Sequence, residues 1–366
     1  MRRTAPLIVG GGPAGAAAAI ALAAGGVRPL LLERTVETGD ALCGGFLSWR
    51  SLAALERLGI PADALNRDRI GEVRLFAGGQ SSSASLPQPG LTVSRRTLDT
   101  LLLSRASAVA AVERGVAVRA IEDGLPRLAD GSVLSTDSLF LATGKYDLRG
   151  VPRPPTARGS DPVLGLRVRL APSAALARLV GQRIELHLFR RGYAGIARQE
   201  DGAVNLCMAV HRSRLDEAGS PAALLATLGR EEPVLGERLA FMTSEPIQAI
   251  ANVPYGWRAR KGRSGLFRLG DQAAVIPSLA GEGMGIALAS GVSAAHALLR
   301  GGSDAATGWQ ARFAATARRP MAVAGLLRRL AEGPVAPWMV RAAFPGLIQL
   351  VADATRIDHI EASQGT

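Results

Sequence analysis

Three glycines stand near the start of the chain, in the stretch PLIVGGGPAGAAAAIAL, where an apolar run meets an alanine-rich segment. Gly10, Gly12 and Gly15 have the spacing at which a strand turns tightly into a helix and the backbone comes close to a diphosphate. The free N–H groups and partial positive charge of the helix N-terminus would then bind phosphate oxygens. We therefore expect a strand over residues 6–10, a helix over residues 14–24 and a diphosphate beside the turn.

A carboxylate follows at the distance that such a turn requires. Residues 28–32 form a second apolar run, and Glu33 ends it, 18 residues after Gly15. This is close to the spacing of an acid that hydrogen-bonds the ribose of a bound adenosine. The alternative is a solvated glutamate at a strand end. Because strand, glycine turn, helix, second strand and acid occur in order, we predict that an ADP moiety binds here.

A second glycine-rich segment, GLFRLGDQAAVIPSLAGEGMGIALASG, occupies residues 265–291. It resembles the superfamily of flavoprotein monooxygenases and geranylgeranyl reductases, whose FAD domain is like that of para-hydroxybenzoate hydroxylase. In that family the acid that matches Asp271 binds the ribityl or ribose-side hydroxyls, and the proline that matches Pro277 lies beside the flavin ring. The helix start that matches Gly283 and Met284 faces the pyrimidine edge. A helix N-terminus suits reduced flavin, which is anionic at N1.

Two further segments resemble the same family, in the same order. VSRRTLDTLL, residues 93–102, resembles the segment R-x-x-L-D, whose cofactor-contacting arginine matches Arg95. SLFLATGKYDLRG, residues 138–150, resembles the strand and Ala-Thr-Gly element that returns to the FAD. An enzyme that binds only NAD would explain the first motif but not the Gly-Asp motif, so the resemblance implies FAD, with NAD(P)H as electron donor. The predicted cofactor-binding residues are Gly10, Gly12, Pro13, Ala14, Gly15, Glu33, Arg34, Cys43, Gly44, Gly45, Arg95, Thr143, Gly144, Asp271, Pro277, Gly281, Gly283 and Met284.

The resemblance implies an α/β chain with a discontinuous Rossmann-like FAD-binding domain, a mixed-sheet substrate domain and a helical C-terminal tail. Alternating runs such as LGLRVRL and RIELHLF suit half-buried antiparallel strands. The tail segment PWMVRAAFPGLIQLV would be core, or would cover a lipophilic pocket or touch a membrane surface. We place the FAD-binding domain in residues 1–72, 91–150 and 253–302, the substrate domain in residues 73–90 and 151–252, and the C-terminal region in residues 303–366.

Three residues are candidates for catalysis. Cys43, in ALCGGFLSW, resembles the Cys-Gly-Gly loop of geranylgeranyl reductases and of flavoproteins encoded beside type III polyketide synthases, which are the nearest resemblance. Tyr193 and His187 could orient a phenol or donate a proton. The alternatives are a small buried thiol and structural side chains on strands. Aromatic residues make up only 4% of the chain, so we expect an aliphatic pocket and a small lipophilic substrate.

The resemblance implies first an FAD-dependent monooxygenase that hydroxylates a lipophilic, phenolic or polyketide-derived substrate through a flavin C4a-hydroperoxide. The alternative is a prenyl-reductase-like enzyme that reduces carbon–carbon bonds, although the Trp-x-Phe-Pro element of prenyl reductases is missing around Tyr193. The third hypothesis is a non-catalytic basic flavoprotein that binds an anionic surface. Thr143-Gly144 replaces the Asp-Gly that hydroxylases use with NADPH, which leaves room for a separate flavin reductase.

Composition narrows the partners. The net charge is +12, but arginine supplies all but two of the 43 basic residues and no run exceeds two, which disfavours nucleic acid. Cys43 and Cys207 are too few for a disulfide framework or a zinc cluster, and we predict no metal site. No apolar stretch reaches about 18 residues, so we expect no transmembrane segment, with peripheral membrane contact left open. Because the start of the sequence lacks a secretory pattern, we expect a cytoplasmic protein.

Overall fold

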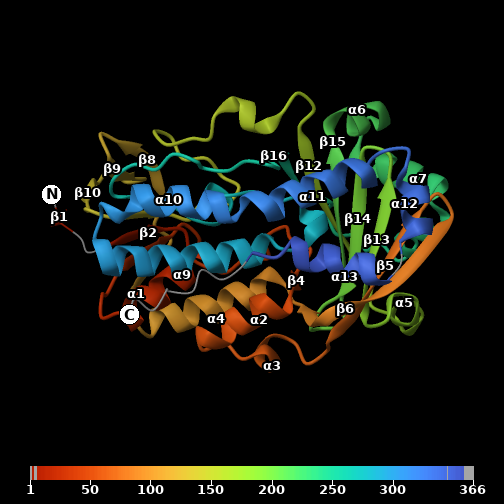
Figure 1. Cartoon of the computed structure of the whole chain (residues 1–366), viewed down its shortest axis with the longest axis horizontal. Coiled ribbons are helices and arrows are strands. Elements are labelled where there is room, and N and C mark those ends of the chain that lie inside the picture. Colours follow the sequence, from red (N-terminus) through yellow and green to blue (C-terminus); the bar gives the residue numbers. More distant parts are fainter. Residues whose placement is uncertain (1, 4–5, 344, 358–366) are drawn as a thin grey trace.

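A computed structural model describes residues 2–3, 6–343 and 345–357, and Figure 1 shows its arrangement. One half of the molecule is built on a five-stranded sheet in the order β17-β11-β2-β3-β7, in which all neighbouring strands are parallel. In chain order, these strands are β2 (Leu7–Val9), β3 (Leu30–Glu33), β7 (Ala111–Arg114), β11 (Leu139–Leu141) and β17 (Leu266–Arg268). The predicted strand–helix–strand unit at the start of the chain is thus present. Strand β17, which belongs to the second glycine-rich segment at residues 265–291, joins the same sheet.

Two helices from distant parts of the sequence pack together beside this sheet. They are α1 (Pro13–Ala24) and α9 (Gly283–Gly301). Their close approach requires small residues, because a Cβ at Gly291 would overlap the carbonyl oxygen of Ala14. The alanines of α1 from Ala14 to Ala21 are buried, which suits the same close approach. This packing brings the N-termini of α1 and α9 to one region of the molecule.

The other half is an eight-stranded mixed sheet in the order β16-β12-β15-β14-β13-β5-β6-β4. Its pairs are antiparallel except for β13 with β5, so the predicted mixed sheet is found. In chain order the strands are β4 (Phe46–Leu47), β5 (Ile70–Ala77), β6 (Gln80–Thr92), β12 (Val163–Leu170), β13 (Arg183–Phe189), β14 (Gly192–Arg198), β15 (Val204–His211) and β16 (Gln248–Val253).

Strand alternation gives this sheet two different faces. On one face, side chains such as Leu166, Phe189 and Leu206 pack against Leu224 and Leu235 of the helices that follow β15. On the other face, Leu186 and Leu188 border the cavity described below. The helices beside the first face are α5 (Ala174–Val180), α6 (Arg212–Ala218), α7 (Pro221–Glu231) and α8 (Pro233–Leu239).

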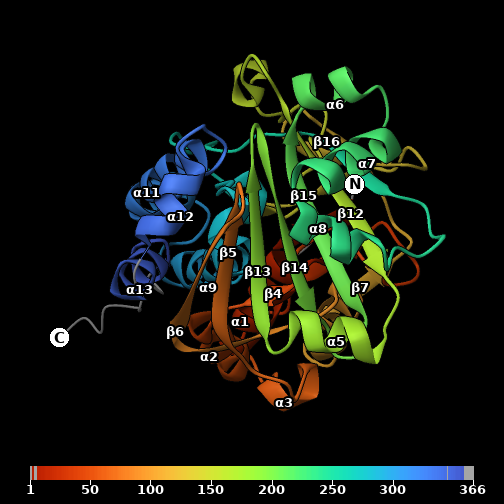
Figure 2. The same cartoon turned by 90° about the vertical axis from the view of Figure 1, so that its right-hand side faces the viewer.

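The C-terminal region is helical, as predicted, within its described residues. Figure 2 shows α11, α12 and α13 gathered at one side of the large sheet, next to β5 and β6. The predicted segment at 358–366, and residue 344, lie outside the described residues. No helix in the described part of the chain combines the length and apolar character needed to cross a bilayer. The helices are α10 (Ala305–Thr316), α11 (Arg318–Ala331), α12 (Ala336–Ala342) and α13 (Pro345–Ala354).

Smaller elements complete the described chain. Helices α2 (Trp49–Arg57) and α3 (Ala62–Leu65) lie between β4 and β5 in the sequence, and α4 (Arg95–Ser107) lies between β6 and β7. Asp123 and Gly124 connect β8 (Val118–Glu122) and β9 (Leu125–Leu128) in an antiparallel hairpin. A two-stranded parallel pair joins β1 (Arg2–Arg3) to β10 (Leu134–Ser135). Three short 3₁₀ turns cover Pro155–Arg158, Gly270–Gln272 and Ser278–Ala280.

Candidate active site

The glycine turn between β2 and α1 borders a cavity of about 1000 Å³. Gly10 has a φ of +107°, and a Cβ there would lie 2.5 Å from the carbonyl oxygen of Ala142. A Cβ at Gly15 would overlap the carbonyl oxygen of Gly10, so glycine is needed at both positions for the helix to meet the turn. Gly12 differs, because a Cβ there would meet only the Nη2 of Arg95, at 3.4 Å. The space in front of Gly12 is therefore open to a ligand.

The N-terminus of α1 faces this open space. Gly12 is its N-cap, Pro13 is its first residue, and no side chain caps its N–H groups. Ala14 follows, and all three residues line the cavity. Uncapped N–H groups and the helix dipole favour an anion at such a position. The geometry is that expected for a diphosphate site.

Glu33 lies at the end of β3, beside the same turn. Its Oε2 accepts a hydrogen bond from the N–H of Gly11 at 2.7 Å, and its Oε1 accepts from the N–H of Thr35 at 2.9 Å. The predicted ribose-binding acid is thus at the cavity and held in one orientation. Beyond it, the guanidinium of Arg34 lies 4.2 Å from the ring centroid of Tyr146, and both residues border the cavity.

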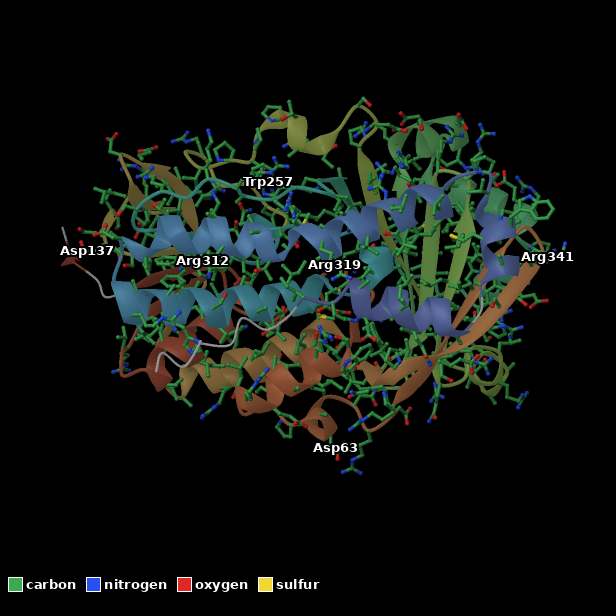
Figure 3. The ribbon with its side chains drawn as sticks, in the orientation of Figure 1. Asp63, Asp137, Trp257, Arg312, Arg319 and Arg341 are labelled. Atoms are coloured by element: carbon green, nitrogen blue, oxygen red, sulfur yellow. The ribbon has the colours of Figure 1, made fainter. Side chains whose placement is uncertain are left out.

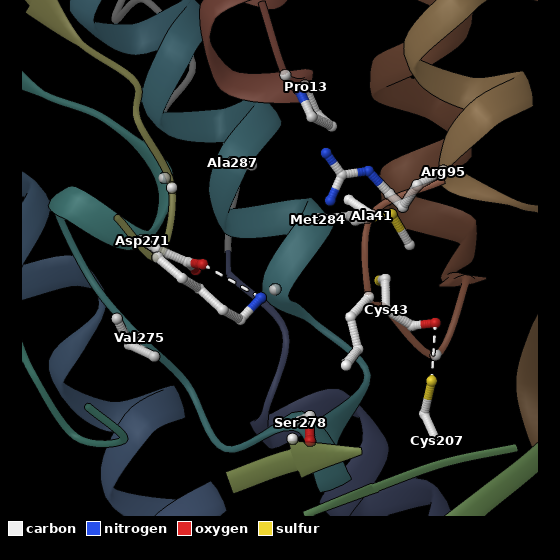
Figure 4. A pocket seen from close by; sticks show the side chains of 18 of the residues that line it. Pro13, Ala41, Cys43, Arg95, Cys207, Asp271, Val275, Ser278, Met284 and Ala287 are labelled. Atoms are coloured by element: carbon white, nitrogen blue, oxygen red, sulfur yellow. Dashed lines mark hydrogen bonds and ion pairs between the residues drawn. The ribbon is translucent and has the colours of Figure 1, made fainter. Parts of the chain in front are cut away.

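Arg95 adds a fixed positive charge opposite the N-terminus of α1. Its Nε and Nη2 donate hydrogen bonds of 2.9 and 2.7 Å to the two carboxylate oxygens of Asp99. Burial alone would lower the pKa of Arg95, but the charge and hydrogen bonds of Asp99 outweigh burial and raise the pKa. Figure 4 shows the guanidinium pointing toward Pro13 across the cavity. This is the placement expected of an arginine that contacts the cofactor.

Asp271 lies on the opposite wall, in an ion pair that the sequence prediction omits. Its Oδ2 is 3.5 Å from the Nζ of Lys145, which Figure 4 marks with a dashed line. The Coulombic attraction of Asp271 raises the pKa of Lys145 against the opposing effect of burial, so the amine stays charged. Lys145 follows the predicted pair Thr143 and Gly144 directly and is one of only two lysines in the chain. The rarity of lysine in this arginine-rich chain is a sequence signal that could have marked Lys145 as a candidate site residue.

Arg153 holds the loops after β11 and β17 together. Its Nη1 donates to the carbonyl of Asp271 at 3.0 Å, and its Nη2 donates to the carbonyl of Lys145 at 2.6 Å. Its Nε donates to Asp147 Oδ1 at 2.7 Å. Because this arginine is buried, its charge requires these partners. Arg153 thereby fixes the spacing between Asp271 and Lys145, and no motif in the sequence predicts it.

The N-terminus of α9 forms the far end of the cofactor-sized part of the cavity. Gly281 has a φ of +65° and ends the short turn after Pro277, and a Cβ at Gly283 would meet nothing within 4 Å. Gly281, Gly283 and Met284 all border the cavity, and no side chain caps α9. Two uncapped helix N-termini, those of α1 and α9, therefore face the same cavity.

A C-terminal arginine holds this second turn in place. Arg356 Nη1 donates to the carbonyl of Ala280 at 2.7 Å and to Glu282 Oε2 at 3.0 Å. Both ionic side chains are almost completely buried. The ring of Trp49 lies 5.3 Å from the Arg356 guanidinium carbon. The sequence prediction omits Arg356, which lies 74 residues from Glu282 and outside every motif.

The Cys-Gly-Gly loop lies along the cavity and is hydrogen-bonded to the large sheet. Arg167 Nη1 donates to the carbonyl of Ala41 at 3.1 Å, and the carbonyl of Cys43 accepts from Asn205 Nδ2 at 2.9 Å and from Cys207 Sγ at 3.1 Å. Burial raises the pKa of Cys207 to about 12, so it remains a thiol donor. These bonds aim the backbone of the loop at the sheet and leave the Cys43 side chain at the cavity, as Figure 4 shows.

The space beside this loop is open. A Cβ at Gly44 would meet nothing within 4 Å, whereas Gly45 has a φ of +82° and a Cβ there would lie 2.5 Å from the carbonyl oxygen of Val93. Gly45 therefore serves the turn, and Gly44 leaves room for a flat ligand. The predicted residues Cys43, Gly44 and Gly45 are together at one edge of the cavity.

Tyr193 borders the cavity, but its hydroxyl is committed to the turn after Pro277. Its Oη is 2.7 Å from Ser278 Oγ and accepts from the N–H of Leu279 at 3.0 Å. Tyr255 Oη lies 2.7 Å from the same Ser278 Oγ, which makes a chain of three hydroxyls. Burial raises the pKa of Tyr193 well above its ordinary value, so its hydroxyl stays protonated. The geometry gives Tyr193 a positioning role for this turn.

His187 does not reach the cavity. It points to the opposite face of the large sheet from Leu186 and Leu188, and it stacks on Phe76 with a centroid distance of 4.7 Å. Its Nε2 is 3.3 Å from Glu185 Oε2, and Glu185 also pairs with Arg238. Burial lowers the pKa of His187. His187 is therefore not one of the described residues that line the cavity, because strand alternation points its side chain into the core.

The rest of the cavity is lined by aliphatic side chains. They come from the large sheet and from the inward faces of α11, α12 and α13, which agrees with the expected lipophilic pocket. The predicted tail segment thus covers part of this cavity. The main contributors are Val73, Leu75, Ile184, Leu186, Leu188, Ile250, Leu327, Met339, Ile348 and Val351. We call this part the aliphatic chamber.

The residues present fit FAD. Open space lies in front of Gly12, Gly44 and Gly283, which are spread along one continuous cavity. A diphosphate would lie at the N-terminus of α1 between Arg95 and the Asp271–Lys145 pair, and Glu33 would lie at the adenosine end. The ring would lie between the Cys-Gly-Gly loop and the N-terminus of α9. When bound, FAD would supply two-electron redox chemistry at the edge of the aliphatic chamber.

Comparisons with known proteins agree with this site. Residues 3–127 match the FAD binding domain family. Menaquinone reductase of Mycolicibacterium smegmatis is 29% identical over 90% of this chain and 87% of that protein. Digeranylgeranylglycerophospholipid reductase 1 of Methanopyrus kandleri is 27% identical over 78% of this chain and 77% of that protein. The crystal structure of PqsL from Pseudomonas aeruginosa, a probable FAD-dependent monooxygenase, has the same fold, with a TM-score of 0.70, 19% identity and coverage of 93% of this chain and 100% of that chain.

These findings favour an enzyme over the hypothesis of a non-catalytic flavoprotein. The FAD binding domain, the uncapped helix N-termini and the shared fold lead to one conclusion. The chain is an FAD-dependent oxidoreductase, similar in sequence to two reductases and in fold to a probable FAD-dependent monooxygenase.

Proposed function

We propose that this oxidoreductase reduces a carbon–carbon double bond in a lipophilic substrate that carries a long apolar chain. The observation that carries the proposal is the aliphatic chamber, which continues from the Cys-Gly-Gly loop to the inner faces of α11–α13. Apolar surface of this extent would bind an aliphatic chain by excluding water from it. The chamber offers few polar groups to recognise a small polar substrate.

The sequence relatives favour reduction over hydroxylation. The two relatives named above are called reductases, one of menaquinone and one of a digeranylgeranyl phospholipid, and each aligns with more than three quarters of this chain. The motifs of the chain alone favour hydroxylation, but the names of these relatives favour reduction, and we therefore place reduction first.

The chain's own residues would hold the reacting bond and supply a proton. Reduction of a carbon–carbon double bond adds two electrons and two protons. When bound and reduced, FAD would supply both electrons and one proton as a hydride, which leaves one proton for the chain to supply. Cys43 is the candidate proton donor, because its side chain lies at the cavity beside the predicted ring site while its carbonyl is held by Asn205 and Cys207. The Tyr193–Ser278–Tyr255 hydroxyl chain would keep the facing turn rigid. We propose NAD(P)H as the electron source, either directly or through a separate flavin reductase.

A second candidate is hydroxylation of a lipophilic phenol. The hydroxyl chain from Tyr193 through Ser278 to Tyr255 favours it, because such a chain could accept a phenolic hydrogen bond at the edge of the cavity. The fold shared with PqsL is compatible with this reaction. The two candidates require the same cofactor and the same chamber, but they differ in whether oxygen is consumed.

One experiment separates the two reactions. The FAD-loaded protein is reduced with dithionite under anaerobic conditions and mixed with a polyprenyl quinone, a geranylgeranyl lipid or an alkyl phenol. Reduction of the carbon–carbon bond predicts that the flavin reoxidises without oxygen and that the lipid product, once any quinol head group is reoxidised in air, is still heavier by two hydrogens. A product heavier by one oxygen, formed only in air, would establish hydroxylation and contradict the first proposal. Leu327→Trp, which narrows the chamber away from the predicted ring site, should slow long-chain substrates more than short ones.

A further inference from the structure

Large apolar side chains are exposed mainly on the C-terminal helices. Eight large hydrophobic side chains are exposed among the described residues, and five of them lie in the range from Leu326 to Leu350. Trp338 and Leu350 are the most exposed of the five, at 67% and 65%. Scattered single residues of this kind are normal on protein surfaces, whereas a group on one set of helices indicates an interaction surface.

The sequence spacing of these residues places them on shared helix faces. On α11, Arg319, Leu326 and Leu330 are separated by seven and four residues, so they follow one outward stripe. Across the turn into α12, Val335, Trp338 and Arg341 recur at every third position. The guanidinium carbon of Arg341 lies 5.9 Å from the ring centroid of Trp338, which confirms that these two side chains adjoin.

The same surface is basic. Arg318, Arg319, Arg329 and Arg341 are exposed. The two acidic residues between positions 318 and 357 are Glu332 and Asp353. Glu332 Oε2 accepts hydrogen bonds from Arg328 and from His211, so Asp353 alone is an exposed acid among the described residues of that range. Figure 3 shows how Arg312, Arg319 and Arg341 follow the row of helices α10, α11 and α12.

The inner faces of these helices line the aliphatic chamber. Leu327 of α11, Met339 of α12 and Val351 of α13 border it, while Leu326, Trp338 and Leu350 on the same helices are exposed. Each helix therefore presents apolar side chains both to the chamber and to the outside. A single layer formed by α11, α12 and α13 therefore separates the chamber from the outer surface of these helices.

We propose that the outer surface of α11–α13, formed by Leu326, Leu330, Val335, Trp338, Leu350, Arg319, Arg329 and Arg341, docks on an anionic lipid bilayer. Exposed leucine and tryptophan side chains would enter the headgroup region, and the arginines would pair with lipid phosphates. A second copy of this chain is a poorer occupant, because a twofold contact through this surface would bring like charges together. The proposal does not rest on the reaction that the enzyme catalyses, since docking is measured without turnover.

Vesicle co-sedimentation of the full-length FAD-loaded protein tests the proposal. Vesicles of phosphatidylglycerol and phosphatidylcholine are compared with vesicles of phosphatidylcholine alone, at low and moderate salt. We expect binding to the anionic vesicles that weakens with salt. Arg329→Glu and Arg341→Glu should each lower the partition coefficient about fivefold or more, from the typical contribution of a basic residue near an anionic membrane. Trp338→Ser should lower it by a similar factor.

Matched controls lie on other faces of the molecule. Arg178→Glu and Arg230→Glu remove exposed arginines from α5 and α7, and Val36→Ser removes an exposed apolar side chain elsewhere. These variants should bind vesicles as the original protein does, and FAD content should be unchanged in every variant. Absence of binding to either vesicle type would overturn the proposal, as would equal losses from surface and control variants. A dimer that Trp338→Ser dissociates, with no vesicle binding, would assign this surface to a second copy instead.

Discussion

Arg356 and Glu282 form a buried ion pair with a distance of 3.0 Å between Nη1 and Oε2, and the same nitrogen donates to the carbonyl of Ala280. The pair joins the end of the C-terminal helices to the turn that begins α9. The turn borders the predicted ring site. The C-terminal region therefore both covers the aliphatic chamber and holds the turn beside the ring end of the predicted cofactor site. Burial raises the pKa of Glu282, and Arg356 opposes that effect.

Removal of this arginine should weaken FAD binding. Arg356→Met leaves a buried carboxylate without its partner, which typically destabilises a protein by about 3–5 kcal/mol. Because the loss falls on the α9 turn, we expect the dissociation constant for FAD to rise about tenfold or more and the flavin absorption band to change shape. Titration of the apoprotein with FAD measures both effects. Arg356→Lys should restore part of the affinity, and a Met variant with unchanged affinity and spectrum would refute the positioning role.

Gly12→Ala should separate cofactor binding from folding. Its Cβ would meet only Arg95 Nη2, at an acceptable 3.4 Å, so the apoprotein should keep its thermal stability. The methyl group would occupy the space predicted for the diphosphate, and FAD affinity should fall about tenfold or more, which is about 1.4 kcal/mol. Gly325→Ala is the control, because that glycine also has open space around it but lies on α11. Unchanged FAD affinity in Gly12→Ala would place the diphosphate elsewhere.

How far the sequence predicts this site depends on where each partner lies. Gly10, Gly15 and Glu33 belong to one strand–turn–helix–strand unit, so local spacing is enough to place them, and the family resemblance of one contiguous segment is enough for Asp271. Arg167 reaches a loop 126 residues away, and Arg356 acts across 74 residues, so only the packed structure shows their roles. His187 illustrates the opposite case, because a suitable residue type on a cavity-lining strand points to the wrong face.

Cys43→Ala should lower turnover without releasing the cofactor. The side chain lies at the cavity, and the substitution keeps the carbonyl that accepts from Asn205 and Cys207, losing only the 3.5 Å bond from the Gly45 N–H to Sγ. If the thiol donates a proton, the rate of flavin reoxidation by substrate should fall by about 10²-fold or more, with FAD content unchanged. Rapid-mixing absorbance spectroscopy follows that rate. A Cys43→Ala enzyme that reoxidises at the original rate would remove Cys43 from the chemistry.

His211 should make the attachment of α11 depend on pH. Its Nδ1 is 3.1 Å from Asp161 Oδ2 and its Nε2 is 3.0 Å from Glu332 Oε2. The hydrogen bond with Glu332 raises the pKa of His211, against opposing effects of burial and Arg328. A raised pKa in the folded state stabilises the protein below the ordinary histidine pKa, about 6.5, and this stabilisation is lost as pH rises through the raised value.

The comparison of the original protein with His211→Gln measures this effect. Urea unfolding between about pH 5.5 and 9 should show the original protein more stable by roughly 1.5–3 kcal/mol at the acidic end, which is typical of hydrogen bonds to charged groups. The difference should shrink toward alkaline pH. A difference that grows with pH, or that does not change with pH, would show that His211 is not charged between these carboxylates.

The central claim is that distant segments of the chain converge to hold one FAD, with the ADP end at α1 and the ring end at α9. Calorimetric titration of the apoprotein with FAD, FMN and ADP tests this claim most directly. We predict one FAD per chain, bound at least about a hundredfold more tightly than FMN, with ADP competing for the same site. A protein that binds FMN as tightly as FAD, or that binds FAD while ADP fails to compete, would contradict the account.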